Sequence, residues 1–436
     1  MLRVCCRLGM AKTFEYLVVG GGNAAGYACR EFVANGVEAG KVGVVTAEPV
    51  LPYERPALTK AYLHPPTAKV RARLPGFHTC VGGGGERQTT EWYAEKGITL
   101  LHGRASAVDV AAKSVQVGDD QCSYEKLIIA TGARPLRVSA FGVKGDDLKN
   151  VFYLREEHEA AELVGTLERL DASTTKIVIV GGGYIGLECA AALVGWGMDI
   201  TMVFPEAHCM PRLFTADLAQ WLENEYAARG VKILKGDLVT EFLGEGGSLA
   251  GVQLKSGGTL QCTVAVVGVG AVPNTEFCAG LSMEKGGFLV DEAMRTSDAN
   301  IFACGDVCTF PSNYGGVSRC EHVDHARKSA KQSVQSALGL NPAPYVYLPY
   351  FYSRLFEYTD APIVFNFFGD QTGECQVCAR KEKSLGAIWV KDGKVMGALL
   401  MGSPGPSGED QAKLREAVAA APPTAGANGF FESASL

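Results

Sequence analysis

Two glycine-rich segments of the chain have the spacing that binds dinucleotides. They are Gly20-Gly21-Gly22-Asn23-Ala24-Ala25-Gly26 and Gly181-Gly182-Gly183-Tyr184-Ile185-Gly186. In such a segment the first glycine permits a tight turn, the second lets the backbone approach a pyrophosphate, and the third lets a helix pack on a strand. The free amides and the dipole of the helix N-terminus then favour a diphosphate. Each segment therefore predicts a dinucleotide site.

The elements that must position these glycines are predictable on both sides. A β-branched apolar strand precedes each segment, and a helix of small residues follows it. The expected strands are Tyr16–Val19 and Lys176–Val180, and the expected helices are Ala24–Phe32 and Ile185–Val194. Roughly 20 residues further on, a second strand is expected to end in an acid that accepts from the adenosine ribose. Glu48 and Glu206 occupy these places. Two dinucleotides on one chain indicate a flavin that is reduced by a nicotinamide.

Composition limits the partners of the protein. The chain has 436 residues, of which 47% are hydrophobic and 20% charged, and its net charge is -6. This length predicts about three domains. The acidic balance argues against nucleic acid, because phosphate backbones need a basic face. No apolar run approaches the roughly 18 residues of a membrane span. We expect neither a nucleic-acid nor a membrane partner.

The 14 cysteines predict free thiols in a reducing compartment, because a secreted disulfide framework is typical of small chains. Cys375 and Cys378 have the spacing of a metal or redox pair, but no second pair accompanies them, so we favour a structural role. The cluster of Glu321, His322, Asp324 and His325 could also suggest a metal site, because its histidines share a helical face, but no further ligands occur at a metal-binding spacing. No metal is expected.

The termini give weak signals of compartment. Met1–Gly9 contains Arg3 and Arg7 without an acid, which would suit the start of a targeting segment, but it is short and poor in serine. The C-terminal Ser433–Leu436 lacks the basic residue of the peroxisomal signal. The cytoplasm is favoured, with plastid, mitochondrion and peroxisome left open. The oligomeric state is also open, with a monomer favoured.

Two connectors divide the chain into domains. Leu127–Pro135 and Val264–Pro273 each close a buried strand and then turn, and the second glycine segment lies between them. The predicted fold is α/β, with two Rossmann-like dinucleotide-binding domains, the NAD domain inserted into the FAD domain, and a smaller C-terminal α+β domain. The predicted boundaries are 12–150 and 275–344 for the FAD domain, 151–274 for the NAD(P)H domain and 345–436 for an antiparallel C-terminal domain with a mobile tail.

With both glycine segments, both connectors and Gly305-Asp306 in this order, residues 12 to about 340 resemble the flavoprotein disulfide reductase superfamily. Disulfide reductases of this superfamily carry a reactive Cys-x4-Cys after the first glycine segment, and here Cys29 has no such partner. We therefore expect electrons to leave the flavin without a dithiol relay.

Several blocks resemble the monodehydroascorbate reductases of plants and algae. These blocks are Pro52–Lys60, Arg73–His78, Gly181–Glu188, Met210–Phe214, Glu321–Arg327 and Leu348–Arg354. From Phe356 to Cys378 the chain is expected to depart from the family pattern. The resemblance implies an NADH-dependent FAD enzyme that transfers hydride to FAD and then two single electrons to two monodehydroascorbate radicals, which gives ascorbate. The alternatives are a ferredoxin-type reductase and a redox-sensing flavoprotein like the apoptosis-inducing factors.

The resemblance also implies roles for single residues. Asp306 would accept from the ribityl hydroxyls of the flavin, and Lys60 would lie near the flavin ring, paired with Glu188. Glu206 favours NADH, because a carboxylate repels the 2'-phosphate of NADPH; Arg212 nearby tempers this preference, so NADPH is only less favoured. Tyr184 could cover the nicotinamide face of the flavin, or simply pack.

The acceptor is a small anionic radical, so its site needs a cation. Arg319 is the candidate, followed by Glu321 and His322 at the start of an expected helix, with Tyr350 and Tyr352 supplying hydroxyl groups and rings. One of these tyrosines could belong to the core.

The predicted site falls into three sets. The catalytic set is Lys60, Glu188, Arg319, Tyr350 and Tyr352. The FAD set is Gly20, Gly22, Asn23, Ala24, Ala25, Glu48, Arg55, Lys60, Thr131, Arg134, Asp306, Val307, Glu321, His322 and Tyr352. The NAD set is Gly181, Gly183, Tyr184, Ile185, Glu188, Glu206, Arg212, Gly268 and Gly270.

Overall fold

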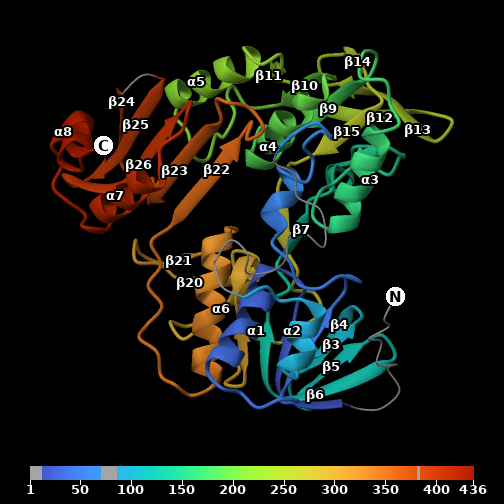
Figure 1. The fold of residues 1–436 in the computed structure, drawn as a ribbon, viewed down its shortest axis with the longest axis vertical. Helices are drawn as coiled ribbons and strands as arrows, with labels where there is room; N and C mark the ends of the chain where they lie inside the picture. The colour runs from blue at the N-terminus through green and yellow to red at the C-terminus, as the bar shows by residue number, and fades with distance from the viewer. Residues whose placement is uncertain (1–11, 70–85, 381–382) are drawn as a thin grey trace. The chain divides into compact units, whose positions relative to one another are not determined.

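The computed structural model describes residues 12–69, 86–380 and 383–436 (Figure 1). The expected targeting segment Met1–Gly9 and the block Arg73–His78 lie outside these residues. The chain forms two compact units. The described residues of the first unit fall within Met1–Arg55, Arg73–Arg134 and Val272–Tyr347, and those of the second within Pro56–Ala72, Pro135–Ala271 and Leu348–Leu436. No helix of the described residues is long and apolar enough to cross a bilayer.

A seven-stranded sheet forms the centre of the first unit. Its parallel strands run in the order β3 (Thr99–His102), β2 (Val42–Thr46), β1 (Lys12–Val19), β6 (Asp120–Ile129) and β19 (Ile301–Ala303). Beyond the start of β6, β5 (Ser114–Val117) and β4 (Ala105–Asp109) continue antiparallel. Every residue of β2 is buried, as expected for a parallel strand that is covered on both faces.

Helices α1 (Asn23–Ala34), α2 (Thr90–Glu95) and α6 (Val323–Ala337) cover one face of this sheet. Helices α1 and α6 lie side by side (Figure 1), and the small buried residues Ala24, Ala28, Ala326 and Ala330 allow their close approach. On the other face lies a small sheet of β17 (Met283–Glu284), β18 (Gly287–Leu289), β20 (Cys308–Pro311) and β21 (Val317–Ser318).

The second unit contains a five-stranded parallel sheet, in the order β11 (Lys232–Lys235), β10 (Asp199–Phe204), β9 (Lys176–Val180), β15 (Val264–Val267) and β8 (Val151–Phe152). Helices α4 (Tyr184–Leu193) and α5 (Ala216–Ala227) contact its strands, and α3 (Glu157–Leu167) precedes β9. An antiparallel sheet of β12 (Val239–Glu245), β13 (Ser248–Leu254) and β14 (Thr259–Gln261), which the sequence did not predict, packs on it. The short strands β7 (Ala133–Pro135) and β16 (Ala271–Pro273) pair where the two connectors run.

The C-terminal residues form a five-stranded antiparallel sheet, which confirms the predicted sheet. Its order is β22 (Tyr350–Leu355), β23 (Ile363–Gly369), β26 (Lys394–Gly402), β25 (Ser384–Lys391) and β24 (Glu374–Ala379). Helix α7 (Gly408–Ala419) matches the helix expected near Glu409–Val418. Where the sequence suggested a mobile tail, the chain forms α8 (Gly426–Ser433), because Phe430 and Phe431 are buried beside β24 and β25.

Candidate functional site

The first glycine segment leaves the carboxyl end of β1 at the edge where β2 and β6 also end. Val19 pairs with Val45 and with Ile129 on either side. Gly20 has φ +149°, and a Cβ there would lie 2.2 Å from the carbonyl oxygen of Ala130. Only glycine therefore fits this turn, as the fingerprint predicts.

Helix α1 begins with a site that fits a diphosphate. Gly22 is its N-cap residue and has no side chain with which to satisfy the first amides. Within the described chain, Nδ2 of the buried Asn23 has no hydrogen-bond partner. A buried donor without a partner is costly, and a bound anion would satisfy it. Ala24 and Ala25 are buried behind it.

Glu48, the first predicted ribose acid, lies in a buried network. Tyr53 donates its hydroxyl to Glu48 Oε2 at 2.7 Å, and the Arg55 guanidinium forms an ion pair with Oε1. The amide of Arg55 donates to Asn23 Oδ1 at 3.3 Å, and its side chain packs over Gly22. The residue Glu48 is 5% exposed. Glu48 and Arg55 are thus held beside the first glycine segment, as the sequence expects.

The first connector makes contacts with the chain that follows the second connector. Thr131 donates through Oγ1 to the carbonyl of Asn274 at 2.8 Å, and the Asn274 amide donates back to the Thr131 carbonyl at 2.9 Å. Arg134 forms an ion pair with Glu276, which lowers the pKa of that carboxyl. Both predicted FAD contacts, Thr131 and Arg134, therefore already have protein partners.

The residues around Asp306 gather at the start of α6. Gly305 to Val307 form a short 3-10 turn, η4, directly after β19. Arg319 donates to the Asp306 carbonyl at 3.3 Å and to Glu321 Oε1 at 2.5 Å. His322 is the N-cap residue of α6 and accepts from the amide of Asp324 at 3.3 Å. Arg319, the predicted cation of the acceptor site, therefore contacts the backbone of Asp306.

The second glycine segment repeats the geometry of the first. Gly181 has φ +117°, and a Cβ there would lie 2.3 Å from the carbonyl oxygen of Gly268. Gly183 is the N-cap residue of α4 and, like Gly22, has no capping side chain. Gly268 packs on Ile185, where a Cβ would meet Cγ2 at 3.0 Å. This end of the sheet fits a second diphosphate.

The surroundings of the second ribose acid are open. Glu206 follows the end of β10, is exposed, and is held by its backbone, whose carbonyl accepts from the amide of Gly236 at 3.2 Å. Arg212 is also exposed. The loop that carries both is fixed to the glycine segment by the amide of Met210, which donates to the Gly182 carbonyl at 2.9 Å.

Glu188 of α4 collects three donors although the residue is only 4% exposed. The Lys60 ammonium lies 2.7 Å from Oε2, which confirms the predicted ion pair. Thr59 donates to the same oxygen at 2.5 Å, and Ser353 of β22 donates to Oε1 at 2.6 Å. A buried carboxylate needs such compensation. The two hydroxyl groups were not predicted; their only sequence signal is that Thr59 and Ser353 each fall within a recognised block.

The aromatic residues of this unit extend from α4 along β22. Tyr184 packs edge-on against Phe351, with ring centroids 5.3 Å apart. Tyr350 stacks on Phe368 at 4.5 Å, and its hydroxyl accepts from Gln411 at 2.5 Å. Burial raises the pKa of Tyr352. Tyr184, Tyr350 and Tyr352 belong to the second unit and Arg319 to the first.

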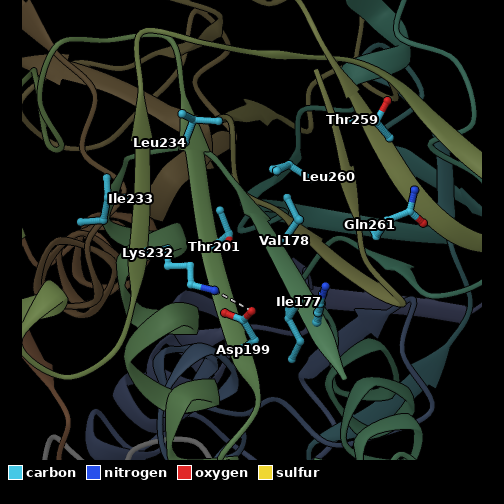
Figure 2. Close-up of a pocket in the computed structure, with 11 residues that line it drawn as sticks. Ile177, Val178, Asp199, Thr201, Lys232, Ile233, Leu234, Thr259, Leu260 and Gln261 are labelled. Carbon is cyan, nitrogen blue, oxygen red and sulfur yellow. Dashed lines mark hydrogen bonds and ion pairs between the residues drawn. The ribbon is translucent and has the colours of Figure 1, made fainter. Parts of the chain in front are cut away.

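A cavity of about 500 Å³ lies beside the parallel sheet of the second unit. Figure 2 shows Val178, Thr201, Leu234 and Leu260 around it, with Lys232 bonded to Asp199 on the rim. The lining residues of β9 and β10 lie in the first halves of these strands, and the others belong to β11 and β14. Since ligands of parallel sheets bind at the carboxyl ends, this cavity is not the dinucleotide site.

Comparison with known families agrees with this geometry. The family model of pyridine nucleotide-disulphide oxidoreductases matches residues 14–330, and that of the monodehydroascorbate reductase 3-like C-terminal domain matches residues 348–429. The chain therefore belongs to the class of flavoprotein oxidoreductases that bind FAD and a pyridine nucleotide. The second match includes Phe356–Cys378, so the expected departure from the family there was wrong.

Curated relatives define the family more closely. A monodehydroascorbate reductase of Solanum lycopersicum is 46% identical over 408 residues, which is 90% of this chain and 92% of the relative. Peroxisomal monodehydroascorbate reductase 1 of Arabidopsis thaliana is 46% identical over 420 residues, 93% of this chain and 94% of the relative. The chain is a member of the monodehydroascorbate reductase family.

Solved structures share the fold. A ferredoxin reductase from Rhodopseudomonas palustris is 27% identical with a TM-score of 0.76, over 89% of this chain and 91% of that one. Putidaredoxin reductase in its covalent complex with putidaredoxin is 24% identical with a TM-score of 0.82, over 97% and 96%. These likenesses support the architecture of two dinucleotide folds and an antiparallel C-terminal sheet.

Proposed function

We propose that this protein reduces the monodehydroascorbate radical to ascorbate with electrons from NADH. The observation that carries the proposal is a pair of dinucleotide cradles, at Gly20–Asn23 and Gly181–Tyr184, in a chain that is 46% identical to reductases of this name. The segment Gly20–Asn23 would hold FAD and the segment Gly181–Tyr184 the nicotinamide dinucleotide, and FAD, when bound, would supply a centre that accepts a hydride and can release two electrons singly. Two radicals are then reduced for each NADH.

The alternatives are less well supported. The solved ferredoxin reductase is 27% identical to this chain, against 46% for the tomato relative. A net charge of -6 also gives little attraction to an acidic protein partner. A redox sensor would turn over slowly with every acceptor, and an assay of NADH oxidation with different acceptors would therefore distinguish it from a reductase.

The preference for NADH rests on Glu206. Its carboxylate is exposed after β10, and we expect it to accept from a ribose hydroxyl and to repel a 2'-phosphate. Glu206→Gln should raise kcat/KM for NADPH relative to NADH by about tenfold, the effect of losing roughly 1.4 kcal/mol of repulsion. Glu241→Gln, at another exposed acid of the same unit, is the matched control and should leave the ratio unchanged. An unchanged ratio in Glu206→Gln would remove Glu206 from the proposal.

The anionic acceptor is assigned to Arg319. Within the described residues, its hydrogen bonds run through one terminal nitrogen, to Glu321 and to the Asp306 carbonyl, whereas a guanidinium has five donors. Arg319→Gln should raise KM for the radical while NADH still reduces the flavin, with FAD content measured in parallel. Arg295→Gln, at an exposed arginine of the same unit, is the control. The roles of Lys60, Tyr184, Tyr350 and Tyr352 stay predictions for the same assay.

The decisive experiment follows NADH oxidation by the FAD-loaded protein. The radical is generated from ascorbate with ascorbate oxidase, and NADPH and a ferredoxin serve as comparison substrates. Fast NADH loss that depends on the radical supports the proposal. Activity only with the ferredoxin, or flavin reduction without turnover, would replace it by one of the alternatives.

We also propose that the protein works as a monomer in the cytoplasm. Every cysteine in the described part of the chain is free, which suits a reducing compartment. Named relatives include peroxisomal and chloroplastic or mitochondrial forms, so the family itself does not fix the compartment. Sedimentation of the purified protein and fractionation of the source cells test the two statements separately.

A further inference from the structure

The turn at Gly305 is wedged between α1 and α6. Gly305 has φ +73°, and a Cβ there would lie 3.2 Å from Cβ of Ala24 and 3.7 Å from Cβ of Ala326. A larger residue at this position would therefore be strained by its φ and crowded by Ala24. Asp306, the residue that the sequence resemblance assigns to the ribityl hydroxyls of the flavin, follows directly.

The amide of Gly305 is held by a buried serine of α6. It donates to Ser329 Oγ at 2.9 Å, while that hydroxyl donates to the carbonyl of His325 at 2.7 Å, one helical turn earlier. Ser329 is fully buried. A serine inside a helix is at best neutral for helix stability, and a buried hydroxyl costs free energy without partners. The hydrogen bond from the Gly305 amide explains why a serine stands at this buried position of the helix.

The carbonyl of Gly305 faces a second buried group. Cys308 donates its thiol to this carbonyl at 3.2 Å, and Nε2 of His325 lies 3.6 Å from the sulfur. On the opposite side of the imidazole, the Tyr345 hydroxyl lies 2.9 Å from Nδ1. Phe310 stacks on the ring at 4.5 Å. The ring is therefore fixed on both edges and on one face.

The protonation state of His325 follows from its burial, which lowers its pKa to about 4 against the attraction of Asp306 and Asp324. The imidazole is neutral at pH 7 and has one N–H. If the Tyr345 hydroxyl donates to Nδ1, the proton is on Nε2, which faces Cys308 and Gly305. The ring then completes a hydrogen-bonded chain from Tyr345 to the turn.

We propose that Ser329 and His325 are positioning residues for the flavin: Ser329 binds the Gly305 amide, and His325 supports the Cys308 thiol that donates to the Gly305 carbonyl, so that together they fix the direction of the Asp306 carboxylate. Arg319 holds the next carbonyl, that of Asp306. The inference rests on the proposed role of Asp306 toward the ribityl hydroxyls of FAD. It adds two residues of α6 that would not touch the cofactor themselves.

The experiment titrates flavin-free protein with FAD and follows the quenching of flavin fluorescence. Ser329→Ala should weaken FAD binding at least about tenfold, the value of one well-placed hydrogen bond to a preorganised site. Ser333→Ala is the matched control, because Ser333 is equally buried one turn later on α6 and contacts the carbonyl of Ala303 at 3.5 Å instead of Gly305. It should bind FAD like the unmodified protein.

Two further variants separate positioning from folding. Ser329→Cys keeps the side-chain size with a poor acceptor, and His325→Phe keeps the ring without its nitrogens. Both should stay folded by circular dichroism, weaken FAD binding, and alter the visible circular dichroism of the bound flavin. FAD affinity and flavin spectra within twofold of the Ser333→Ala values in both Ser329 variants would overturn the proposal.

The outcomes also distinguish this inference from the proposed function. FAD titration uses no electron acceptor, so a protein that binds FAD but does not reduce the radical contradicts the proposed function and leaves the positioning role standing. Full radical reduction together with unchanged FAD affinity in the Ser329 variants contradicts only the positioning role.

Discussion

The two glycine segments share a backbone geometry but differ in what surrounds them. Beside the first, Glu48 is buried and bound by Tyr53 and Arg55, and Arg55 packs over Gly22. Beside the second, Glu206 is exposed, and among the described residues nothing lies within 4 Å of a Cβ built on Gly183. The same local motif thus occurs twice, the first time in a closed environment and the second time in an open one.

This difference suits a resident cofactor and an exchanging one. A buried, charge-compensated network is organised before the ligand arrives, so less order is lost on binding. An exposed acid on a loop forms its contact at a lower cost in desolvation and allows rapid release. We therefore expect the glycine spacing to select the class of ligand and the neighbouring side chains to set how long the ligand stays bound.

The largest effect is expected from the glycines that the two segments share. Gly20→Ala and Gly181→Ala place a Cβ 2.2 and 2.3 Å from carbonyl oxygens at positive φ, so each should reduce the free energy of unfolding by about 3 kcal/mol or more. Gly183→Ala, whose Cβ meets open space, should cost less than about 1 kcal/mol. Guanidinium unfolding measures all three, and equal losses would show that the turn geometry is not limiting.

The next largest effect on stability is expected at Glu48, and a much smaller one at Glu206. Glu48→Ala removes the carboxylate that pairs with Arg55, whose side chain is 17% exposed and still donates to the Tyr53 hydroxyl, and should cost about 3 kcal/mol in the free energy of unfolding, with loss of FAD on dialysis. Glu206→Ala should change stability by less than about 0.5 kcal/mol, because its carboxylate is exposed. If both variants unfold alike, the contrast between closed and open environments is wrong.

Acid should weaken the first unit through His325. Its pKa of about 4 in the folded protein lies below the unfolded value of 6.5, so the unfolded chain takes up the proton first as pH falls. The associated stability is complete above pH 6.5 and is lost progressively toward pH 4, by about 3 kcal/mol. Unfolding titrations across this range should show a shallower pH dependence in His325→Phe. Identical pH profiles would refute the assignment.

The smallest effect is expected at the cavity of the second unit. The Lys232 side chain, on its rim, is 65% exposed and pairs with Asp199 at 2.7 Å, and such surface pairs contribute about 0–1 kcal/mol. Lys232→Ala should therefore leave stability nearly unchanged, with KM for NADH equal to that of the unmodified protein. A raised KM would place the coenzyme at the amino ends of the strands, against the comparison.

The sequence by itself determined the two strand–glycine–helix units, the acids after β2 and β10, the importance of Gly305-Asp306, the antiparallel C-terminal sheet and the pair of Lys60 with Glu188. Each is encoded by local spacing, by strand alternation or by a recognised block. Only the tertiary structure decided which neighbours complete these sites. Thr59 and Ser353 at Glu188, and Ser329 and His325 at Gly305, come from distant segments, and a single buried hydroxyl or imidazole has no periodicity to reveal it. Their placement depends on how helices and strands pack, because burial and hydrogen-bond partners are properties of the folded chain.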